Sequence, residues 1–222
     1  MKKATLLLAA MIALTVCAKK EKQTRVSMLT SKGVIELKLY NETPVHRDNF
    51  IKLVKEGYYN DLLFHRVIQD FMIQGGDPDS REAAPGRLLG EGDPGYTLPA
   101  EIIYPQIYHK RGVLAAAREG DQTNPERRSS GSQFYIVWGK TFSSEEIDKI
   151  ADHVRRTTGA TMPEELKKYY MHYGGTPHLD GAYTVFGEVV KGLEVVNAIQ
   201  QVATDRNDRP LEDVKILSVE IK

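Results

Sequence analysis

The sequence contains one cysteine and one tryptophan among 222 residues, and its lysines and arginines equal its aspartates and glutamates at 30 each. A single cysteine excludes an internal disulfide and a thiolate zinc site, because both require more than one thiol. A formal net charge of zero argues against nucleic acid as the main partner, since phosphate binding normally needs an excess of positive charge. The chain is nevertheless long enough, at 41% hydrophobic residues, to bury one sizeable core.

Several motifs of known enzyme chemistry are also absent from the sequence. The six histidines show no HExxH and no paired metal spacing, and there is no G-x-S-x-G elbow, Walker loop or dinucleotide fingerprint. Ser132 in "SGSQF" lacks the pattern that flanks a hydrolase nucleophile, so we interpret it as structural. An enzyme with this sequence would therefore work through binding and electrostatics alone, with no metal and no cofactor.

No apolar run in the sequence is long enough to span a bilayer as a stable helix. The run at residues 4–16 follows Lys2 and Lys3 and precedes Cys17, an arrangement typical of a secretory signal. The tetrapeptide "LTVC" resembles a bacterial lipoprotein box, in which the cysteine is acylated and becomes the mature N-terminus. We therefore predict a signal peptide over residues 1–17 that ends at the lipidated Cys17.

This prediction makes residues 18–24 a tether between the lipid anchor and the domain that follows. The domain would lie in the periplasm, attached to the cell envelope of a bacterium. The alternative is ordinary signal cleavage after Ala18, with Val16 and Ala18 as the recognised pair. The product would then be a soluble secreted or periplasmic protein.

Alternation and turn signals predict a mainly β domain over residues 25–222. In "VIELKL" apolar and charged residues alternate after the turn "TSKG", as in a half-buried strand. A helix is expected in "ETPVHRDNFIKLVKEGYY", where Thr43 can cap, Pro44 suits the first helical position and Gly57 can end the helix. Further strands are expected at residues 62–68, 71–74, 96–98, 112–117, 133–138 and 214–222. One more helix is expected at residues 192–200.

One segment departs from this strand pattern. Apolar residues recur at helical spacing over residues 143–156, behind a serine cap, and again over residues 163–173. We therefore predict a helical hairpin inserted into the β domain at about residues 139–176. A purely structural elaboration is one interpretation of it, and a role at the substrate groove is the other. The candidates to extend or shield such a groove are Tyr169, Tyr170 and Tyr173.

The segment "FHRVIQDFMIQGGD" at residues 64–77 sets an arginine and a glutamine among large apolar residues. It resembles the most characteristic segment of the cyclophilin-type peptidyl-prolyl cis-trans isomerases. "ETPVHRDNFIKLVKEGYYNDLLFHR", "GSQFYI" and "LDGAYTVFGEVVKGLEVV" resemble further segments of that family, in the expected order, over most of residues 25–222. The resemblance implies a closed eight-stranded antiparallel β-barrel capped by two helices, here with the inserted hairpin. We expect a monomer.

The same resemblance implies a site. The family's catalytic arginine falls on Arg66. Its substrate-binding positions fall on Phe71, Met72, Gln74, Ala117, Arg118, Gln133, Phe134, Tyr135, His178, Leu179 and Tyr183. Tyr135 takes the place of a phenylalanine, and Tyr183 stands where many members have histidine. His178 replaces a tryptophan that helps the eukaryotic members bind cyclosporin, so weak cyclosporin binding is expected.

Prolyl isomerisation suits a site of this composition. Rotation about a peptide bond meets a barrier of roughly 18–20 kcal/mol, and catalysis needs an apolar slot for proline and a donor for the twisted amide. Arginine suits this task because it stays charged and presents its donors in a rigid fork. The implied partners are proline-containing peptides and unfolded or folding envelope proteins, which the enzyme would help to fold after export. Two alternatives stay open: a domain that binds prolyl peptides without turnover, and an envelope holdase chaperone.

Overall fold

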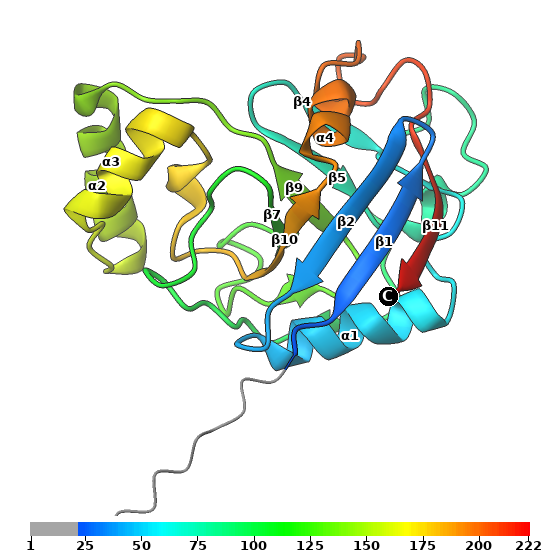
Figure 1. Cartoon of the computed structure of the whole chain (residues 1–222), viewed down its shortest axis with the longest axis horizontal. Coiled ribbons are helices and arrows are strands. Elements are labelled where there is room, and N and C mark those ends of the chain that lie inside the picture. Colours follow the sequence, from blue (N-terminus) through cyan, green and yellow to red (C-terminus); the bar gives the residue numbers. More distant parts are fainter. Residues whose placement is uncertain (1–21) are drawn as a thin grey trace, which may run out of the picture.

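The computed structural model of this chain describes residues 22–222 as a curled β-sheet with helices around it (Figure 1). The predicted signal peptide, the lipidation of Cys17, cleavage after Ala18 and most of the tether lie outside the described residues. Within residues 22–222, no helix is both long enough and apolar enough to cross a membrane. The helices are α1 (Pro44–Lys55), α2 (Ser144–Thr158), α3 (Glu164–Tyr173), α4 (Leu193–Gln200) and the 3₁₀ helices η1 (Pro78–Ser80) and η2 (Pro177–Leu179).

The strands form one nine-stranded sheet and one two-stranded sheet. Their bounds are β1 Arg25–Thr30, β2 Gly33–Leu39, β3 Leu62–Leu63, β4 Arg66–Ile68, β5 Met72–Gly75, β6 Thr97–Leu98, β7 Val113–Ala116, β8 Ser129–Ser130, β9 Phe134–Val137, β10 Val185–Lys191 and β11 Lys215–Ile221. The order in the large sheet is β3-β11-β1-β2-β10-β7-β9-β5-β4, and its neighbouring strands run antiparallel. The mainly β prediction is confirmed, and every predicted strand segment overlaps at least one of these strands.

The large sheet has nine strands instead of the predicted eight, and the segment 62–68 contributes two of them. Phe64 and His65 interrupt it, so β3 and β4 lie at opposite ends of the sheet order although they are close in the chain. The Phe64 amide donates to the carbonyl of Val214, the residue just before β11. Phe64 therefore continues the contact of β3 with the β11 side of the sheet. No strand pairing joins β3 to β4 in the described part of the chain. The sheet is therefore strongly curled, and a fully closed eight-stranded barrel stays a prediction.

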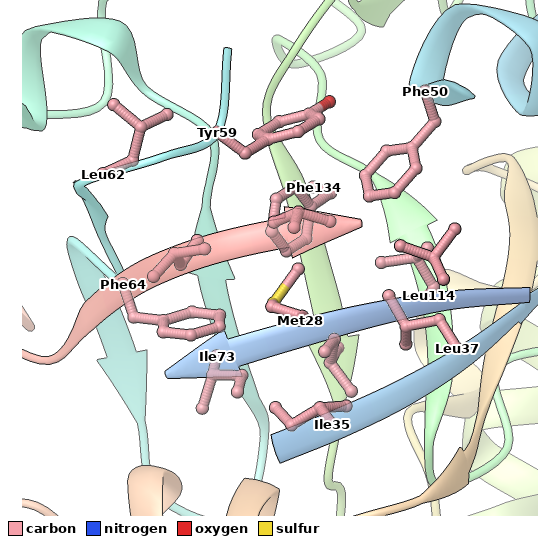
Figure 2. Close-up of a cluster of buried hydrophobic side chains, with 14 of the residues drawn as sticks. Met28, Ile35, Leu37, Phe50, Tyr59, Leu62, Phe64, Ile73, Leu114 and Phe134 are labelled. Carbon is pink, nitrogen blue, oxygen red and sulfur yellow. The ribbon is translucent and has the colours of Figure 1, made fainter. Parts of the chain in front are cut away.

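A hydrophobic core fills the space that the sheet encloses (Figure 2). Successive side chains of a strand point to opposite faces, so in β9 Phe134 enters this core while Tyr135 belongs to a second cluster on the other face. α1 and α4 lie at opposite ends of the sheet (Figure 1) and contribute Phe50 and Ile199 to the core. These are the two capping helices that the family resemblance implies.

The N-terminus of α1 is capped differently from the sequence prediction. Thr43 is the N-cap residue, but its side chain makes no capping hydrogen bond. The carboxylate of Glu101 instead accepts from the backbone amides of Val45 and His46, at 3.1 and 2.9 Å. A carboxylate is favourable there because the helix N-terminus presents unpaired N–H groups and a partial positive charge. The cap therefore comes from a residue remote in sequence.

The predicted helical hairpin is present as α2 and α3, which pack against each other beside the sheet (Figure 1). Ser143 and Glu146 form a capping box at the start of α2, and Gly159 ends it with a φ of 74°. The two ends of the insert meet, because a Cβ at Gly139 would lie 2.2 Å from the carbonyl oxygen of Gly175. The insert is thus a compact unit that leaves and rejoins the β domain at one place.

Candidate functional site

The outer face of β5, β7 and β9 carries the second hydrophobic cluster. Met72 of β5, Ala115 of β7 and Tyr135 of β9 belong to it, while their strand neighbours such as Ile73 and Phe134 point into the main core. All residues of β7 and β9 are buried for this reason, as expected for strands that are covered on both faces. The curled sheet therefore offers an apolar platform outside the core.

A pocket of about 160 Å³ opens on this platform, and we call it the Arg66 pocket. Its lining consists of Arg66, Phe71, Met72, Gln74, Ala117, Arg118, Tyr135, Leu179 and Tyr183. Each of these residues is a predicted site residue, and they come from four separate parts of the chain. The fold thus brings together two cations, Arg66 and Arg118, one amide and a set of aromatic and aliphatic side chains.

Three predicted site residues lie outside this lining. Gln133 lines an adjoining pocket of about 480 Å³, which shares Gln74, Ala117 and Arg118 with the Arg66 pocket. Phe134 is 1% exposed and packs in the main core (Figure 2). His178 lies beside the pocket, with its ring centroid 5.4 Å from that of Phe71.

Arg66 reaches the pocket from β4 and is partly held in place. It pairs in register with Gln74 of β5, and its Nη1 lies 3.5 Å from Gln74 Oε1. Its Nε lies 3.4 Å from Oδ2 of Asp208. Both distances are long for hydrogen bonds of a charged donor. The guanidinium, whose side chain is 43% exposed, is therefore oriented while its donors stay able to bond a ligand.

A relay of amides fixes Gln74 behind Arg66. Gln74 Nε2 donates to Gln133 Oε1 at 3.0 Å, so Gln74 Oε1 is left as the acceptor that faces Arg66. Gln133 Nε2 in turn donates to the carbonyls of Gly90 and Gly92, both at 2.8 Å. The glycine loop thus sets the orientation of both amides.

Arg118 forms a rigid side of the pocket. Its Nε donates to the carbonyl of Ala182 at 2.8 Å, and its Nη2 lies 2.6 Å from a carboxylate oxygen of Asp121. The guanidinium carbon lies 4.3 Å from the ring centroid of Tyr183, a cation–π contact. Its side chain is only 4% exposed, so Arg118 shapes the wall and holds Tyr183 in it.

His65 and His178, two of the histidines near the site, are uncharged at neutral pH. Burial lowers the pKa of His65 to about 4, an effect that the nearby Asp77 only partly offsets. Burial also lowers the pKa of His178, and His109 lowers it further. Neither of these residues can then serve as a cationic donor to the pocket, which leaves Arg66 and Arg118 as its cations.

Sequence reasoning missed Asp208, the ion-pair partner of Arg66. It is 142 positions away in the chain and sits in a turn with a φ of 63°, so no local pattern marks it. The insert tyrosines are not part of the pocket lining: Tyr170 is buried, and Tyr169 packs edge-on against Tyr108. Within residues 22–222, no group of three or more histidine, aspartate or glutamate side chains is arranged to hold a metal ion.

Comparisons with known proteins point to one family. The sequence model of the family "Cyclophilin type peptidyl-prolyl cis-trans isomerase/CLD" matches residues 25–221. A protein of Staphylococcus saprophyticus named "Putative peptidyl-prolyl cis-trans isomerase" is 35% identical over 201 residues, which cover 90% of this chain and 92% of that protein. A protein of the same name from Staphylococcus haemolyticus is 33% identical over 204 residues, or 91% and 93% of the two chains.

Comparison with solved structures points to the same family. A crystal structure of a cyclophilin-type peptidyl-prolyl cis-trans isomerase from Cryptosporidium parvum superposes with a TM-score of 0.63 at 25% identity, covering 90% of this chain and 98% of that one. A second structure of that protein, in the presence of the dipeptide Ala-Pro, superposes with a TM-score of 0.61. The fold, the pocket and the sequence similarity together show that this chain belongs to the family of cyclophilin-type peptidyl-prolyl cis-trans isomerases.

Proposed function

We propose that the chain accelerates cis–trans isomerisation of Xaa-Pro bonds in the Arg66 pocket, with Arg66 as the catalytic residue. The proline ring would sit among Phe71, Met72 and Leu179. The amide nitrogen becomes pyramidal and basic as the bond twists, so a nearby guanidinium can donate to it or polarise the adjacent carbonyl. This chemistry requires no nucleophile and no cofactor.

The observation that carries this proposal is the position of Arg66 beside an apolar pocket. The bond before proline has nearly balanced cis and trans forms but exchanges over roughly tens to hundreds of seconds. A catalyst therefore needs only to stabilise the twisted state relative to the cis and trans forms. An arginine oriented by Gln74 and Asp208 does not have to reorganise when the amide twists, and such preorganised donors are worth most to catalysis.

A comparison of two activities separates this proposal from the holdase alternative. We expect the wild type to accelerate isomerisation of a prolyl peptide, and Arg66→Lys to be impaired because an ammonium cannot reproduce the planar fork. Suppression of aggregation of an unfolded protein should not change in Arg66→Lys if it depends on surface contacts. If the wild type suppresses aggregation but leaves the isomerisation rate at its spontaneous value, the chain acts as a holdase or binding module instead.

We also propose that the substrates are exported proteins that fold at the bacterial cell envelope. The basis is the N-terminal sequence, where a basic pair and an apolar run precede Cys17. Stable attachment would need more than one acyl chain on this cysteine. Domain residues 25–222 would then stand off the membrane by the tether at residues 18–24.

A further inference from the structure

A chain of hydrogen bonds runs through the interior from the helical insert to the Arg66 pocket. Tyr170 Oη on α3 donates to Asp180 Oδ2 at 2.8 Å, and Asp180 Oδ1 accepts from the His109 backbone amide at 2.9 Å. The same Oδ1 lies 3.1 Å from His109 Nδ1, and His109 Nε2 lies 2.9 Å from Tyr135 Oη. His109 and Asp180 are 1% and 0% exposed, so bulk water does not reach these bonds.

The direction of the two His109 ring bonds follows from the position of the proton on the imidazole. An ionised carboxylate only accepts hydrogen bonds, so His109 Nδ1 must carry its proton toward Asp180. In the tautomer that carries its proton on Nδ1, the Nε2 atom accepts and the Tyr135 hydroxyl donates to it. Burial raises the pKa of Tyr135 and of Tyr170 well above the usual range, so both phenols keep their protons. Asp180 thus has three donors, as a buried carboxylate requires.

At the pocket end, this series of hydrogen bonds holds Tyr135, one of the lining residues. The rings of His109 and Tyr135 lie nearly parallel, at 12° with centroids 6.2 Å apart. Tyr183, another lining residue, meets Tyr135 edge-on at 6.0 Å. Ring contacts alone would let an aromatic side chain slide, whereas the hydrogen bond to His109 fixes the far end of the Tyr135 ring.

At the insert end, the same series of hydrogen bonds depends on how α3 packs. Tyr170 is fully buried in the insert's own hydrophobic cluster. The Thr176 amide donates to the His109 carbonyl at 2.9 Å, and a Cβ at Gly175 would lie only 2.4 Å from that carbonyl oxygen. A shift of α3 would therefore disturb the segment around His109 as well as the bond from Tyr170 to Asp180.

We propose that Asp180 and His109 are positioning residues that hold Tyr135 in the wall of the Arg66 pocket, and that Tyr170 makes this placement depend on the helical insert. The inference rests on the proposed function in taking a prolyl peptide as the ligand of the pocket. A misplacement of about 1 Å can cost about 10²-fold in rate even when its cause lies far from the chemistry. The hydrogen bonds that run from Tyr170 to Tyr135 can therefore tune activity without touching the substrate.

A double-mutant cycle on the full chain tests this inference. The variants are Tyr170→Phe, Tyr135→Phe and the two combined, each of which removes one hydroxyl and keeps the ring. Tyr173→Phe is the matched control, because Tyr173 is on the same helix but is 62% exposed. Four quantities are measured: kcat and KM for an Ala-Pro peptide, the Kd for the same peptide by calorimetric titration, and the unfolding midpoint in urea.

We expect Tyr170→Phe to lower kcat/KM by about fivefold, mainly by raising KM, and to raise Kd by a similar factor, within the range of coupling in hydrogen-bond networks. Tyr173→Phe should change neither quantity. In the Tyr135→Phe background, Tyr170→Phe should have no further effect on KM or Kd, because the link to the pocket is already broken. A merely structural Tyr170 would lower the urea midpoint without this dependence on Tyr135.

An equal effect of Tyr170→Phe in both backgrounds, or no effect in either, would overturn the inference. A wild type that binds the peptide without turnover would refute the proposed catalysis, and the Kd cycle would still decide the role of this series of hydrogen bonds. A wild type that does not bind the peptide at all overturns both proposals.

Discussion

His65 illustrates how one buried side chain makes stability depend on pH. It is 3% exposed, and neither of its ring nitrogens has a hydrogen-bond partner among the described residues. Its pKa falls from an ordinary 6.5 to about 4 because burial disfavours the charged imidazolium. The folded state therefore favours the neutral ring, whereas the unfolded chain takes up a proton as soon as the pH drops below about 6.5.

We predict that this residue contributes stability above pH 6.5 that is lost as the pH falls toward 4, by up to about 3 kcal/mol. Urea unfolding of the wild type and of His65→Gln at pH 7 and pH 4.5 measures it. The loss of unfolding free energy between the two pH values should be smaller in His65→Gln, which does not titrate. Equal losses in both proteins would show that other groups cause the acid sensitivity.

His178 is the second residue whose identity has a measurable consequence. It packs on Phe71 at the side of the pocket, at the position where the family resemblance expects a tryptophan. An imidazole offers less apolar area than an indole and places its donors elsewhere. We predict that His178→Trp tightens cyclosporin binding by about tenfold or more, about 1.4 kcal/mol. Titration calorimetry on both proteins is the measurement, and equal affinities would show that this contact is wrongly assigned.

Among single residues, the sequence predicts the pocket lining better than it predicts the supports behind it. The lining residues lie in recognisable motifs, so resemblance alone locates them. Phe134 is one of the predicted site residues outside the lining: in "SQFYIVW" alternation sends it into the core and leaves Tyr135 on the outer face. Asp208 and His109 lie in no such motif, and only the fold brings them to the site.

At the scale of elements, the insert is an independent packing unit on one side of the domain (Figure 1). Ile147, Val154 and Met162 form its own cluster, against which Tyr104 and Tyr108 of the β domain pack. Because its ends meet at Gly139 and Gly175, a short link can join them without stretching the sheet.

We predict that replacing residues 139–176 with a short glycine-serine link leaves a folded domain with altered selectivity among the residues that flank proline. The change follows because the deletion removes Tyr170 and its hydrogen bond to Asp180. The measurement is kcat/KM over a panel of Xaa-Pro peptides, with circular dichroism to check folding. A folded deletion with an unchanged profile would leave the insert without a role in substrate choice.

Helix caps and stops that are visible in the sequence predict some element boundaries, and other boundaries depend on the fold. The serine cap of α2 and the glycine that stops α3 are visible in the sequence, and both are used. The sequence predicts Thr43 as the side-chain cap of α1, whereas Glu101, which only the fold brings to the helix, accepts the hydrogen bonds of its first amides. The interruption of 62–68 by Phe64 and His65 likewise follows from the curl of the sheet rather than from propensity.

At the scale of the whole molecule, attachment to the envelope is the largest prediction that depends on residues 1–21. We predict that Cys17 carries lipid and that the wild type fractionates with membranes, since more than one acyl chain gives stable association. Metabolic labelling with a clickable fatty acid measures this, and Cys17→Ser should take no label. A wild type that is unlabelled and soluble would support signal cleavage after Ala18 instead.

The catalytic assignment also belongs to the whole molecule, because a β4 arginine, an outer-face pocket and a remote aspartate must act together. Arg87→Ala is a suitable control for Arg66→Ala. Arg87 is 53% exposed and pairs with Asp79 at 3.3 Å, much as Arg66 is 43% exposed and pairs with Asp208 at 3.4 Å. Surface pairs of this kind contribute little to stability, so both variants should fold.

The most direct test is exchange spectroscopy by NMR on an Ala-Pro peptide at equilibrium, with wild type, Arg66→Ala and Arg87→Ala added in catalytic amounts. The wild type should accelerate cis–trans exchange, and Arg66→Ala should lose about 10²–10³ in kcat/KM, the effect of removing one preorganised donor. Arg87→Ala should match the wild type. Near-wild-type exchange by a correctly folded Arg66→Ala would contradict the assignment of Arg66 as the catalytic residue.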